Sequence, residues 1–244
     1  MAPENNQPGP SRRNVWRMFD QIAGTYDLVN RLLSMRRDVV WRRKMAGMLP
    51  PGKALRVLDL ATGTCDVLLA LRRHAPSVAG GAGADMSGGM LRGGQRKLAA
   101  AGLAGMFPLV RSDATRLAFA DGVFDAVTIA FGIRNVVDTD AALGEMLRVL
   151  KPGGRALILE FSLPSNALFR AVYLFYFRHV LPRLGGLVSG KPVAYRYLNE
   201  TVEAFPYGEA FCALMARAGF ERVSAKPLTF GIATLYTGDR PVGA

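Results

Sequence analysis

The stretch Val57 to Asp66, which reads VLDLATGTCD, decides the fold. It continues an apolar run from Leu55, of the kind that forms a parallel strand buried on both faces. A loop of small residues then leads directly into a helical pattern, and Gly63 is the only glycine of that loop. The loop matches neither the GxGxxG nor the GxxxxGK(S/T) pattern, so it disfavours a dinucleotide or a phosphate group as the ligand.

Outward from this stretch, strand-like and helix-like segments alternate along the chain. Such alternation predicts right-handed βαβ crossovers and an α/β fold with a doubly wound, mostly parallel sheet. Two consecutive β-rich segments close the chain and predict an antiparallel hairpin at one edge of this seven-stranded sheet. The predicted strands cover 55–61, 78–85, 109–113, 124–131, 155–161, 220–227 and 229–237, and the predicted helices cover 66–73, 89–101, 139–150 and 207–218.

The composition is typical of a globular protein without a disulfide framework. The chain has 244 residues, half of them apolar, and a net charge of +12, which excludes disorder of the bulk of the chain. The two cysteines lack metal-ligand spacing, so we expect a reducing compartment and no metal site. Residues 1–13 contain no apolar signal region, and no apolar run reaches about 18 residues. We therefore expect a cytoplasmic protein.

Local composition divides the chain into a tail and one domain. Residues 1–13 are rich in proline and predict a disordered tail, and residues 14–244 predict a single domain. Apolar residues at helical spacing predict an N-terminal helical cap over 14–49. Between 163 and 206 the alternation lapses into an aromatic, apolar and basic insert, which we expect on the substrate side.

Three predicted strands end on or next to an aspartate: Asp59, Asp85 and Asp113. In a doubly wound sheet, the ligand lies outside these strand ends. Asp85 is placed to accept both hydroxyl groups of a ribose, and Asp113 with Ala114 is placed to bind an adenine. Three acidic strand ends favour a nucleoside with a positive charge and no phosphate, which describes S-adenosylmethionine. The alternative for any single aspartate is a helix cap.

Several stretches resemble the ubiquinone/menaquinone biosynthesis C-methyltransferase family (UbiE or MenG), which belongs to the class I S-adenosylmethionine methyltransferases. VLDLATGT and LKPGG are generic to that fold. The more specific matches are FDQIAGTYDLVNRLLS at Phe19 to Ser34, FGIRN at Phe131 to Asn135, HVLPRLG at His179 to Gly185 and YRYLNETV at Tyr195 to Val202. The resemblance covers about residues 15–238. It implies a Rossmann-like fold and C-methylation of a demethylated polyprenyl quinol, either demethylmenaquinol or a benzoquinol of the ubiquinone pathway.

The resemblance also implies the residues that contact the donor. They are Thr64, Asp85, Asp113, Ala114 and, through its backbone, Ala130, to which we add Asp59, Gly63 and Met86 from the same strand ends. Thr62 and Cys65 stand where family members usually have glycine. If either position needs a positive φ, the side chain costs about 1 kcal/mol or more and weakens donor binding. Cys65 as a nucleophile is the competing idea, but no base partner accompanies it.

Methylation of a ring carbon requires an electron-rich acceptor, such as a quinol that has lost a phenolic proton. Arg134 can stabilise the phenolate and Asn135 can bond a ring oxygen. His179 is a candidate general base, and Tyr26 can cover the donor. Tyr195, Arg196 and Tyr197 are candidates for the ring pocket. For each residue a structural role is the alternative: a salt bridge for Arg134, a hydrogen-bonded structural histidine for His179 and packing for the tyrosines.

The aromatic insert, with Arg170, Arg178 and Arg183, is suited to lie on an anionic membrane surface and admit a polyprenyl tail. A buried lid helix is the alternative for this insert. A basic cluster in the N-terminal cap supports the same interpretation, with a solvated helix face as its alternative; it comprises Arg31, Arg36, Arg37, Arg42, Arg43 and Lys44. We therefore expect a peripheral position at the inner face of the cell membrane. The sequence leaves open whether two copies of the chain form a homodimer.

Two other functions remain alternatives. The charge of +12 is also typical of phosphate recognition, as in an RNA methyltransferase, but no NPPY-type loop, Pro-Cys nucleophile or appended RNA-binding module accompanies it. We therefore expect no nucleic-acid partner. The altered loop at Thr62 and Cys65 leaves a donor-binding protein without catalytic activity as the second alternative.

Overall fold

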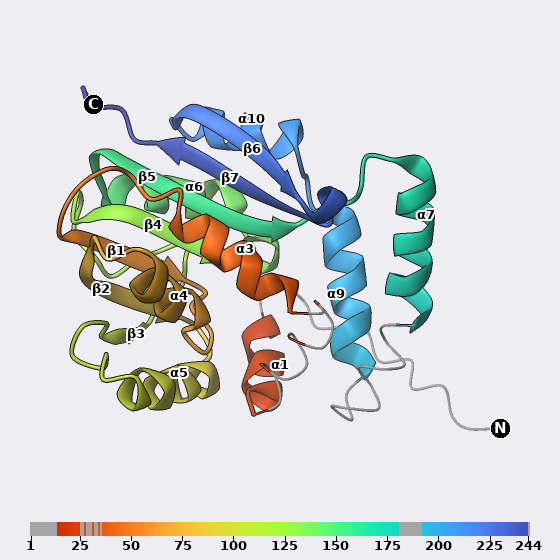
Figure 1. Cartoon of the computed structure of the whole chain (residues 1–244), viewed down its shortest axis with the longest axis horizontal. Helices are drawn as coiled ribbons and strands as arrows, with labels where there is room; N and C mark the ends of the chain where they lie inside the picture. The colour runs from red at the N-terminus through yellow and green to blue at the C-terminus, as the bar shows by residue number, and fades with distance from the viewer. Residues whose placement is uncertain are drawn as a thin grey trace.

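The computed structural model describes residues 14–24, 27, 31, 34, 36–180 and 192–243, with the backbone alone for 180, 192–196 and 198. The predicted tail over residues 1–13 and the predicted cover residue Tyr26 lie outside this part of the chain. The sheet has seven strands in the order β3-β2-β1-β4-β5-β7-β6 (Figure 1). The strands are β1 (Leu55–Leu60), β2 (Val78–Asp85), β3 (Leu109–Arg111), β4 (Phe124–Ala130), β5 (Leu150–Phe161), β6 (Glu221–Leu228) and β7 (Ala233–Asp239).

The pairing of the strands confirms the predicted α/β class and its edge hairpin. β1 pairs in parallel with β2 and β4, β2 with β3, and β4 with β5. β7 lies antiparallel between β5 and β6, so the strand nearest the end of the chain is internal and β6 forms the edge. The chain reverses its direction of winding between β1 and β4, which is where a doubly wound sheet opens a crevice for a ligand.

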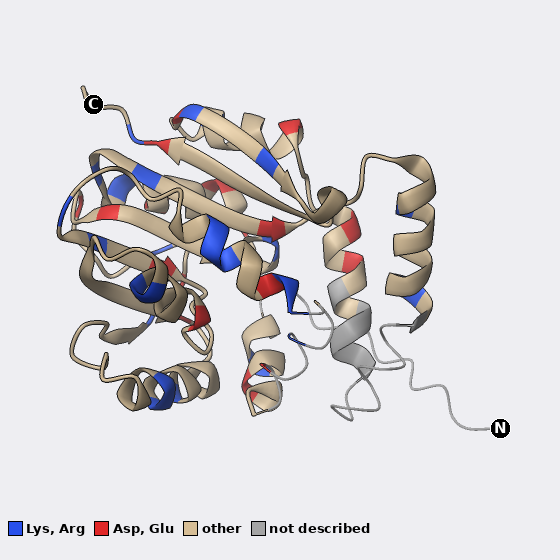
Figure 2. Ribbon diagram, viewed as in Figure 1, with Lys and Arg blue, Asp and Glu red and all other residues tan. Residues whose placement is uncertain are grey.

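Helices cover both faces of the sheet. They are α1 (Val15–Ile22), α3 (Arg37–Ala46), α4 (Asp66–His74), α5 (Gly88–Ala100), α6 (Thr139–Val149), α7 (Ala167–Phe175), α9 (Pro192–Ala204) and α10 (Glu209–Arg217). The predicted cap contributes α1 and α3, and the predicted insert contributes α7, a π-helical turn at Tyr176–Val180 and α9. Figure 2 shows that α7 is mostly without charged residues, whereas α3 carries several. No helix of the described residues is both long and apolar enough to cross a membrane.

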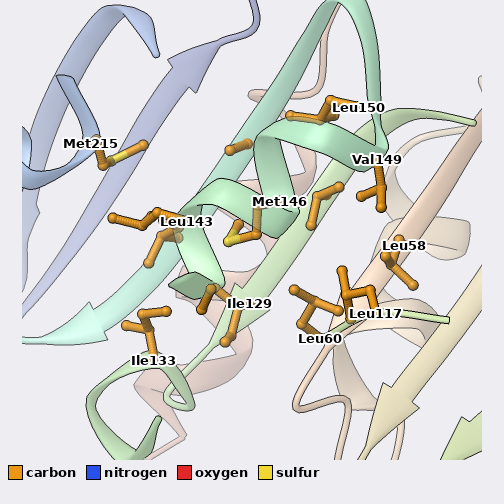
Figure 3. Close-up of a cluster of buried hydrophobic side chains, with 14 of the residues drawn as sticks. Leu58, Leu60, Leu117, Ile129, Ile133, Leu143, Met146, Val149, Leu150 and Met215 are labelled. Atoms are coloured by element: carbon orange, nitrogen blue, oxygen red, sulfur yellow. The ribbon is translucent and has the colours of Figure 1, made fainter. Parts of the chain in front are cut away.

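Alternate residues of β1 separate two apolar layers. Leu58 and Leu60 pack on one face with α6 and α10, around Leu143, Met146 and Met215 (Figure 3). Val57 packs on the other face with side chains of α3, α4 and α5, including Trp41 and Leu68. This alternation follows from the period of two in a strand, and burial of both faces explains the nearly continuous apolar run of β1.

Two predicted boundaries differ from the observed ones by four residues or more. The strand predicted to begin at residue 155 begins at Leu150, directly after α6, so Pro152, Gly153 and Gly154 are part of β5. Gly153 has a φ of 77°, and the register between β4 and β5 shifts between Phe124 and Ala126, so the extra residues form an irregularity within the strand. The last strand begins at Ala233 rather than Thr229, because Thr229–Gly231 forms a 3₁₀ turn.

Candidate active site

A cavity of about 230 Å³ opens at the carboxyl ends of the central strands. Its walls come from the ends of β1, β2 and β4, the segment after β3, the turn before α5, and α1. Six of the predicted donor residues line it, as does Asn135: Gly63, Asp85, Met86, Asp113, Ala114 and Ala130. The crossover topology therefore brings together residues that are up to 72 positions apart, from Gly63 to Asn135.

Asp85 is held in place by the backbone on both sides of it. Its Oδ2 accepts a hydrogen bond from Gly63 N at 2.9 Å, and its Oδ1 accepts one from Ser87 N at 2.8 Å. Burial raises the pKa of Asp85, although the two backbone N–H groups counteract this effect. A carboxylate has about four lone-pair positions, so each oxygen keeps capacity for a ligand hydroxyl group.

Asp113 reaches the same cavity from the end of β3. The residue is exposed, and its Oδ1 accepts hydrogen bonds from Thr115 N and Thr115 Oγ1, both at 2.9 Å. This local turn orients the carboxylate beside Ala114, which also lines the cavity. The segment thus offers a carboxylate and backbone groups to one ligand.

The two residues that replace glycine in the first loop differ in conformation. Cys65 adopts a φ of 67°, so a side chain occupies a left-handed position at a cost of about 1 kcal/mol. Thr62 is not among the residues with positive φ, and its Oγ1 donates to Asp59 Oδ2 at 2.6 Å. Burial raises the pKa of the Cys65 thiol to about 12, which argues against a nucleophilic thiolate.

Asp59 and Thr64 do not line the cavity. Asp59 has no exposed surface, and Thr128 Oγ1 donates to its Oδ1 at 2.6 Å. Burial raises the pKa of Asp59 to about 7, against the lowering effect of its hydroxyl donors. Thr64 Oγ1 donates to Asp27 Oδ1 at 2.6 Å and accepts from Lys97 Nζ at 2.9 Å. These contacts give both residues structural roles behind the loop.

Arg134 and Asn135 follow β4 in a 3₁₀ turn at Ile133–Asn135. Arg134 is buried; its Nη1 donates to Glu160 Oε1 at 2.6 Å and to Phe131 O at 2.7 Å. Its guanidinium carbon lies 5.4 Å from the centroid of the Phe161 ring. The structural alternative for Arg134, a salt bridge, is therefore present, and Arg134 is not among the residues that line the cavity.

The remaining acceptor-side residues are described to different extents. His179 is exposed, and its ring centroid lies 5.1 Å from that of Phe175. Tyr197 is buried with 6% of its surface exposed. Tyr195 and Arg196 belong to α9, and their side chains fall outside the described part. The structure thus brings neither His179 nor Tyr197 into the lining of the cavity.

The sequence interpretation missed four residues near the site. Trp16 lines the cavity from α1, and Asp20 of the same helix bonds the turn before α5. Glu160 pairs with Arg134. Burial raises the pKa of Tyr173 above its usual value, although the nearby charge of Arg134 lowers it. Asp20 lies within the family-specific stretch FDQIAGTYD, so the sequence contained a signal for it. Glu160, an isolated glutamate at a strand end, and Tyr173, one tyrosine in an aromatic insert, have no such signal in the sequence.

Comparison with known proteins identifies relatives over nearly the whole chain. A model of the ubiE/COQ5 methyltransferase family matches residues 8–240. A demethylmenaquinone methyltransferase of Thermus thermophilus is 52% identical over 92% of this chain and all of its own length. A ubiquinone/menaquinone biosynthesis C-methyltransferase of Geobacter sulfurreducens is 49% identical over 91% of this chain and 87% of its own. A crystal structure of an S-adenosylmethionine-dependent methyltransferase from Thermotoga maritima, 18% identical, covers 92% of this chain and 99% of its own with a TM-score of 0.65, which confirms the fold.

The residues of the cavity fit S-adenosylmethionine. The half-buried carboxylate of Asp85 suits ribose hydroxyl groups, the segment at Asp113 suits a nucleobase, and the acidic lining suits a cationic ligand. No phosphate-binding loop is present in the sequence. The family model matches nearly the whole chain, and two relatives are about 50% identical to it. The chain belongs to the ubiE/COQ5 methyltransferase family, and it is an S-adenosylmethionine-dependent methyltransferase.

Proposed function

We propose that this protein transfers the methyl group of S-adenosylmethionine to a ring carbon of a demethylated polyprenyl quinol. The names of the Thermus and Geobacter relatives, both of the quinone pathways, support this acceptor class. We put a naphthoquinol of the menaquinone type ahead of the benzoquinol of the ubiquinone type. The same relatives give no support to an RNA methyltransferase or to a donor-binding protein without activity.

The chemistry requires an activated ring. S-adenosylmethionine supplies an electrophilic methyl carbon attached to a sulfonium. A quinol hydroxyl group loses its proton, and the ortho carbon forms the new carbon–carbon bond while the carbon–sulfur bond breaks. The ring carbon then loses its own proton and the ring becomes aromatic again. The quinol pKa resembles the value of about 10 for tyrosine, so the protein must stabilise the phenolate near neutral pH.

Two buried polar atoms carry this proposal. Arg134 Nε and Asn135 Oδ1 are both inaccessible to solvent, and no hydrogen-bond partner within the described part of the chain reaches either atom. Buried polar groups without partners are rare in native structures, and a bound ligand is one explanation for them. A quinol satisfies both: its phenolate accepts a hydrogen bond from Arg134 Nε, and its other hydroxyl group donates to Asn135 Oδ1.

The ion pair with Glu160 defines how Arg134 acts. Glu160 neutralises the overall charge of the guanidinium and orients it through Nη1, so Arg134 acts through the directed hydrogen bond of Nε. The exposed position of His179 beside Phe175 favours a structural role for this residue over that of a general base. Tyr173, half-buried near the charge of Arg134, is the better placed phenol for orienting the acceptor.

We further propose that α7 rests on a membrane, from which the polyprenyl tail enters. Leu168, Val172 and Phe175 are exposed by 77%, 59% and 64%, and their spacing of four and three residues puts them on one face of the helix. Arg178 is engaged by Glu203 at 2.5 Å, so the apolar stripe rather than this arginine provides the contact. The exposed residues Arg36, Arg37, Arg43 and Lys44 of the cap add attraction to anionic lipids.

Incubation with labelled S-adenosylmethionine tests the acceptor. The arms contain reduced demethylmenaquinol, the corresponding benzoquinol and bulk RNA. Label in the lipid extract of the naphthoquinol arm is the expected result. Label only in the benzoquinol arm would overturn the preferred ring type, and label in RNA would overturn the acceptor class. Donor binding without transfer to any arm would favour the protein without activity.

Sedimentation with vesicles of phosphatidylglycerol tests the membrane contact. Val172→Ser should reduce the bound fraction severalfold, whereas Val242→Ser, which alters a valine exposed by 75% near the end of the chain, should not. Equal binding by both variants would contradict the role of α7. Self-association in analytical ultracentrifugation that Val172→Ser abolishes would mean that a second copy, as a homodimer, covers the stripe instead.

A further inference from the structure

The helix α1 covers one side of the donor cavity. Val15, Trp16 and Phe19 line the cavity together with Asp85 and Met86 from the β2 end. Figure 1 shows α1 beside α5, at the lower edge of the molecule in that view, and the two helices are in contact. A ligand in the cavity is therefore enclosed by residues from a helix that precedes the sheet in sequence.

A single carboxylate joins α1 to the first turn of α5. Asp20 Oδ1 accepts hydrogen bonds from Ser87 Oγ at 2.5 Å and from Gly89 N at 2.7 Å. Ser87 is the N-cap of α5, and its Oγ accepts from Met90 N at 3.1 Å. The first N–H groups of a helix have no partner within the helix, so Asp20 completes a cap that Ser87 begins.

The same turn holds Asp85, the predicted ribose ligand. Ser87 donates its N–H to Asp85 and its hydroxyl group to Asp20, so one residue connects the two carboxylates. The charge of Asp20 also acts on Asp85. Any movement of Asp20 away from Ser87 therefore changes both the cover of the cavity and the surroundings of Asp85.

A second contact ties the two segments together. The guanidinium carbon of Arg111 lies 5.1 Å from the centroid of the Trp16 ring, and Arg111 Nε donates to Met86 O at 2.9 Å. A cation over an indole ring contributes about 0.5–1 kcal/mol at an exposed site. This weaker contact adds to the attraction between α1 and the end of β3, whereas the carboxylate of Asp20 provides the directional hydrogen bonds.

The close approach of the helices depends on a glycine. A Cβ atom at Gly89 would lie 3.0 Å from Asp20 Oδ1 and 3.2 Å from Asp20 O. A Cβ atom at the adjacent Gly88 would meet only Arg92 Nη1, at 3.4 Å, the end of a flexible side chain. Neither glycine has a positive φ, so alanine is compatible with the backbone at both positions. Gly89 and Gly88 thus form a matched pair for testing the contact.

We propose that Asp20 is a positioning residue that holds α1 closed over the donor, so that S-adenosylmethionine enters and its product leaves only when the bonds of Asp20 to Ser87 and Gly89 open. The closed helix excludes water from the donor and keeps Trp16 and Phe19 against it. Asp20 lines no part of the cavity, so it acts through the position of α1.

The experiment measures release of the donor. Labelled S-adenosylmethionine bound to the full chain is chased with excess unlabelled donor. Gly89→Ala and Asp20→Ala should each release the donor about tenfold faster than the unaltered protein, and Gly88→Ala should release it at the unaltered rate. Asp20→Asn keeps an oxygen acceptor for both donors and should restore most of the closed behaviour. The measurement needs no acceptor, so it is independent of the proposed quinol substrate.

Trypsin cleavage after Arg17 provides a second readout. Arg17 is exposed on α1, and donor binding should slow this cleavage in the unaltered protein and in Gly88→Ala, but not in Gly89→Ala. Thermal unfolding of all variants identifies any general loss of stability. The proposal is overturned if Gly89→Ala matches Gly88→Ala in both release rate and protection, or if folded Asp20→Ala retains slow release.

Discussion

Arg134 Nη1 lies 2.6 Å from Glu160 Oε1, and both side chains are buried between the ends of β4 and β5. The two strands are parallel neighbours, with Ala130 opposite Leu159. Arg134 follows β4 and Glu160 lies in the last two residues of β5, so both reach the same edge of the sheet. Glu160 Oε1 also accepts a hydrogen bond from Phe161 N at 2.8 Å. The pair thus combines a structural ion pair with a guanidinium that keeps one unpartnered nitrogen within the described part.

Removal of Arg134 should cost stability. Arg134→Ala leaves the carboxylate of Glu160 buried without its partner and should lower the free energy of unfolding by about 3–5 kcal/mol. In a Glu160→Gln background the same substitution should cost less, with a coupling free energy of about 2–3 kcal/mol. Urea unfolding of the four proteins measures this cycle. Additive effects would mean that the pair contributes no coupling.

A conservative substitution separates catalysis from folding. Arg134→Lys keeps a charge for Glu160, but its single nitrogen cannot replace both Nη1 and Nε of the guanidinium. We expect kcat for the quinol to fall about 10- to 100-fold, the loss of one hydrogen bond to a charged group, with an unchanged Kd for the donor. Steady-state kinetics and calorimetry provide the two numbers. Full activity of this variant would remove Arg134 from the role of phenolate stabiliser.

Asp85 should control donor affinity. Asp85→Ala removes the carboxylate and leaves Gly63 N and Ser87 N without their acceptor, so donor binding should weaken by at least about 100-fold. Asp85→Asn retains an acceptor and should weaken it less. Asp113→Asn, at the exposed end of the cavity, should reduce affinity by about tenfold or less. Titration calorimetry with S-adenosylmethionine tests this order, and a larger effect at Asp113 would reverse the assigned roles.

Asp59 should make stability depend on pH. Its folded-state pKa of about 7 exceeds the unfolded value of about 3.9, so the folded protein binds the proton more tightly. The resulting stabilisation is fully present below about pH 4 and is lost as pH rises through about 7. Asp59→Asn resembles the protonated form, so its stability should not fall in this way as pH rises.

The matched measurement is urea unfolding at pH 5 and pH 8. Asp59→Asn should gain stability relative to the unaltered protein between these values, because it avoids a charge without solvent contact. Thr62 and Thr128 can reorient their hydroxyl groups toward the amide. Asp85, whose pKa burial also raises, is common to both proteins and cancels. A constant difference between the proteins across pH would mean that Asp59 is charged at both values.

Cys65 should be chemically silent in the native state. The residue has no exposed surface, and its pKa of about 12 leaves almost no thiolate at pH 8. A Cβ atom at Gly94 would lie 2.3 Å from Cys65 Sγ, so α5 closes tightly over the thiol. A Cys212→Ser variant should therefore show no rapid reaction with a thiol reagent until urea unfolds it. Rapid labelling would indicate opening of the donor loop.

Several predicted donor residues lie at the ends of strands, and the structure brings these residues together around one cavity. The alternation of segments predicted the doubly wound sheet, and the topology of such a sheet places Gly63, Asp85, Asp113 and Ala130 around one cavity. Cys65 was expected to strain the loop if its position needs a positive φ, and its φ of 67° meets that condition. Thr62, by contrast, serves as a hydroxyl donor to Asp59 rather than as a strained residue.

The roles of individual side chains behind the cavity could not be predicted in this way. Asp59 and Thr64 sit in the expected loop, but their side chains turn toward Thr128 and toward Asp27 and Lys97. A strand or loop position specifies where a backbone runs. Which neighbour a side chain bonds depends on packing between segments that are distant in sequence.

The sequence by itself determined the order of the elements, the layered α/β class, the family and the edge of the sheet at which the cavity lies. These follow from periodicity and from short stretches, which act over a few residues. Only the tertiary structure decided that Asp20 caps α5 across 69 positions and that Glu160 holds Arg134 across 26. Such bonds form when folding brings distant side chains together and removes their water. A local sequence pattern does not predict which distant side chains will meet.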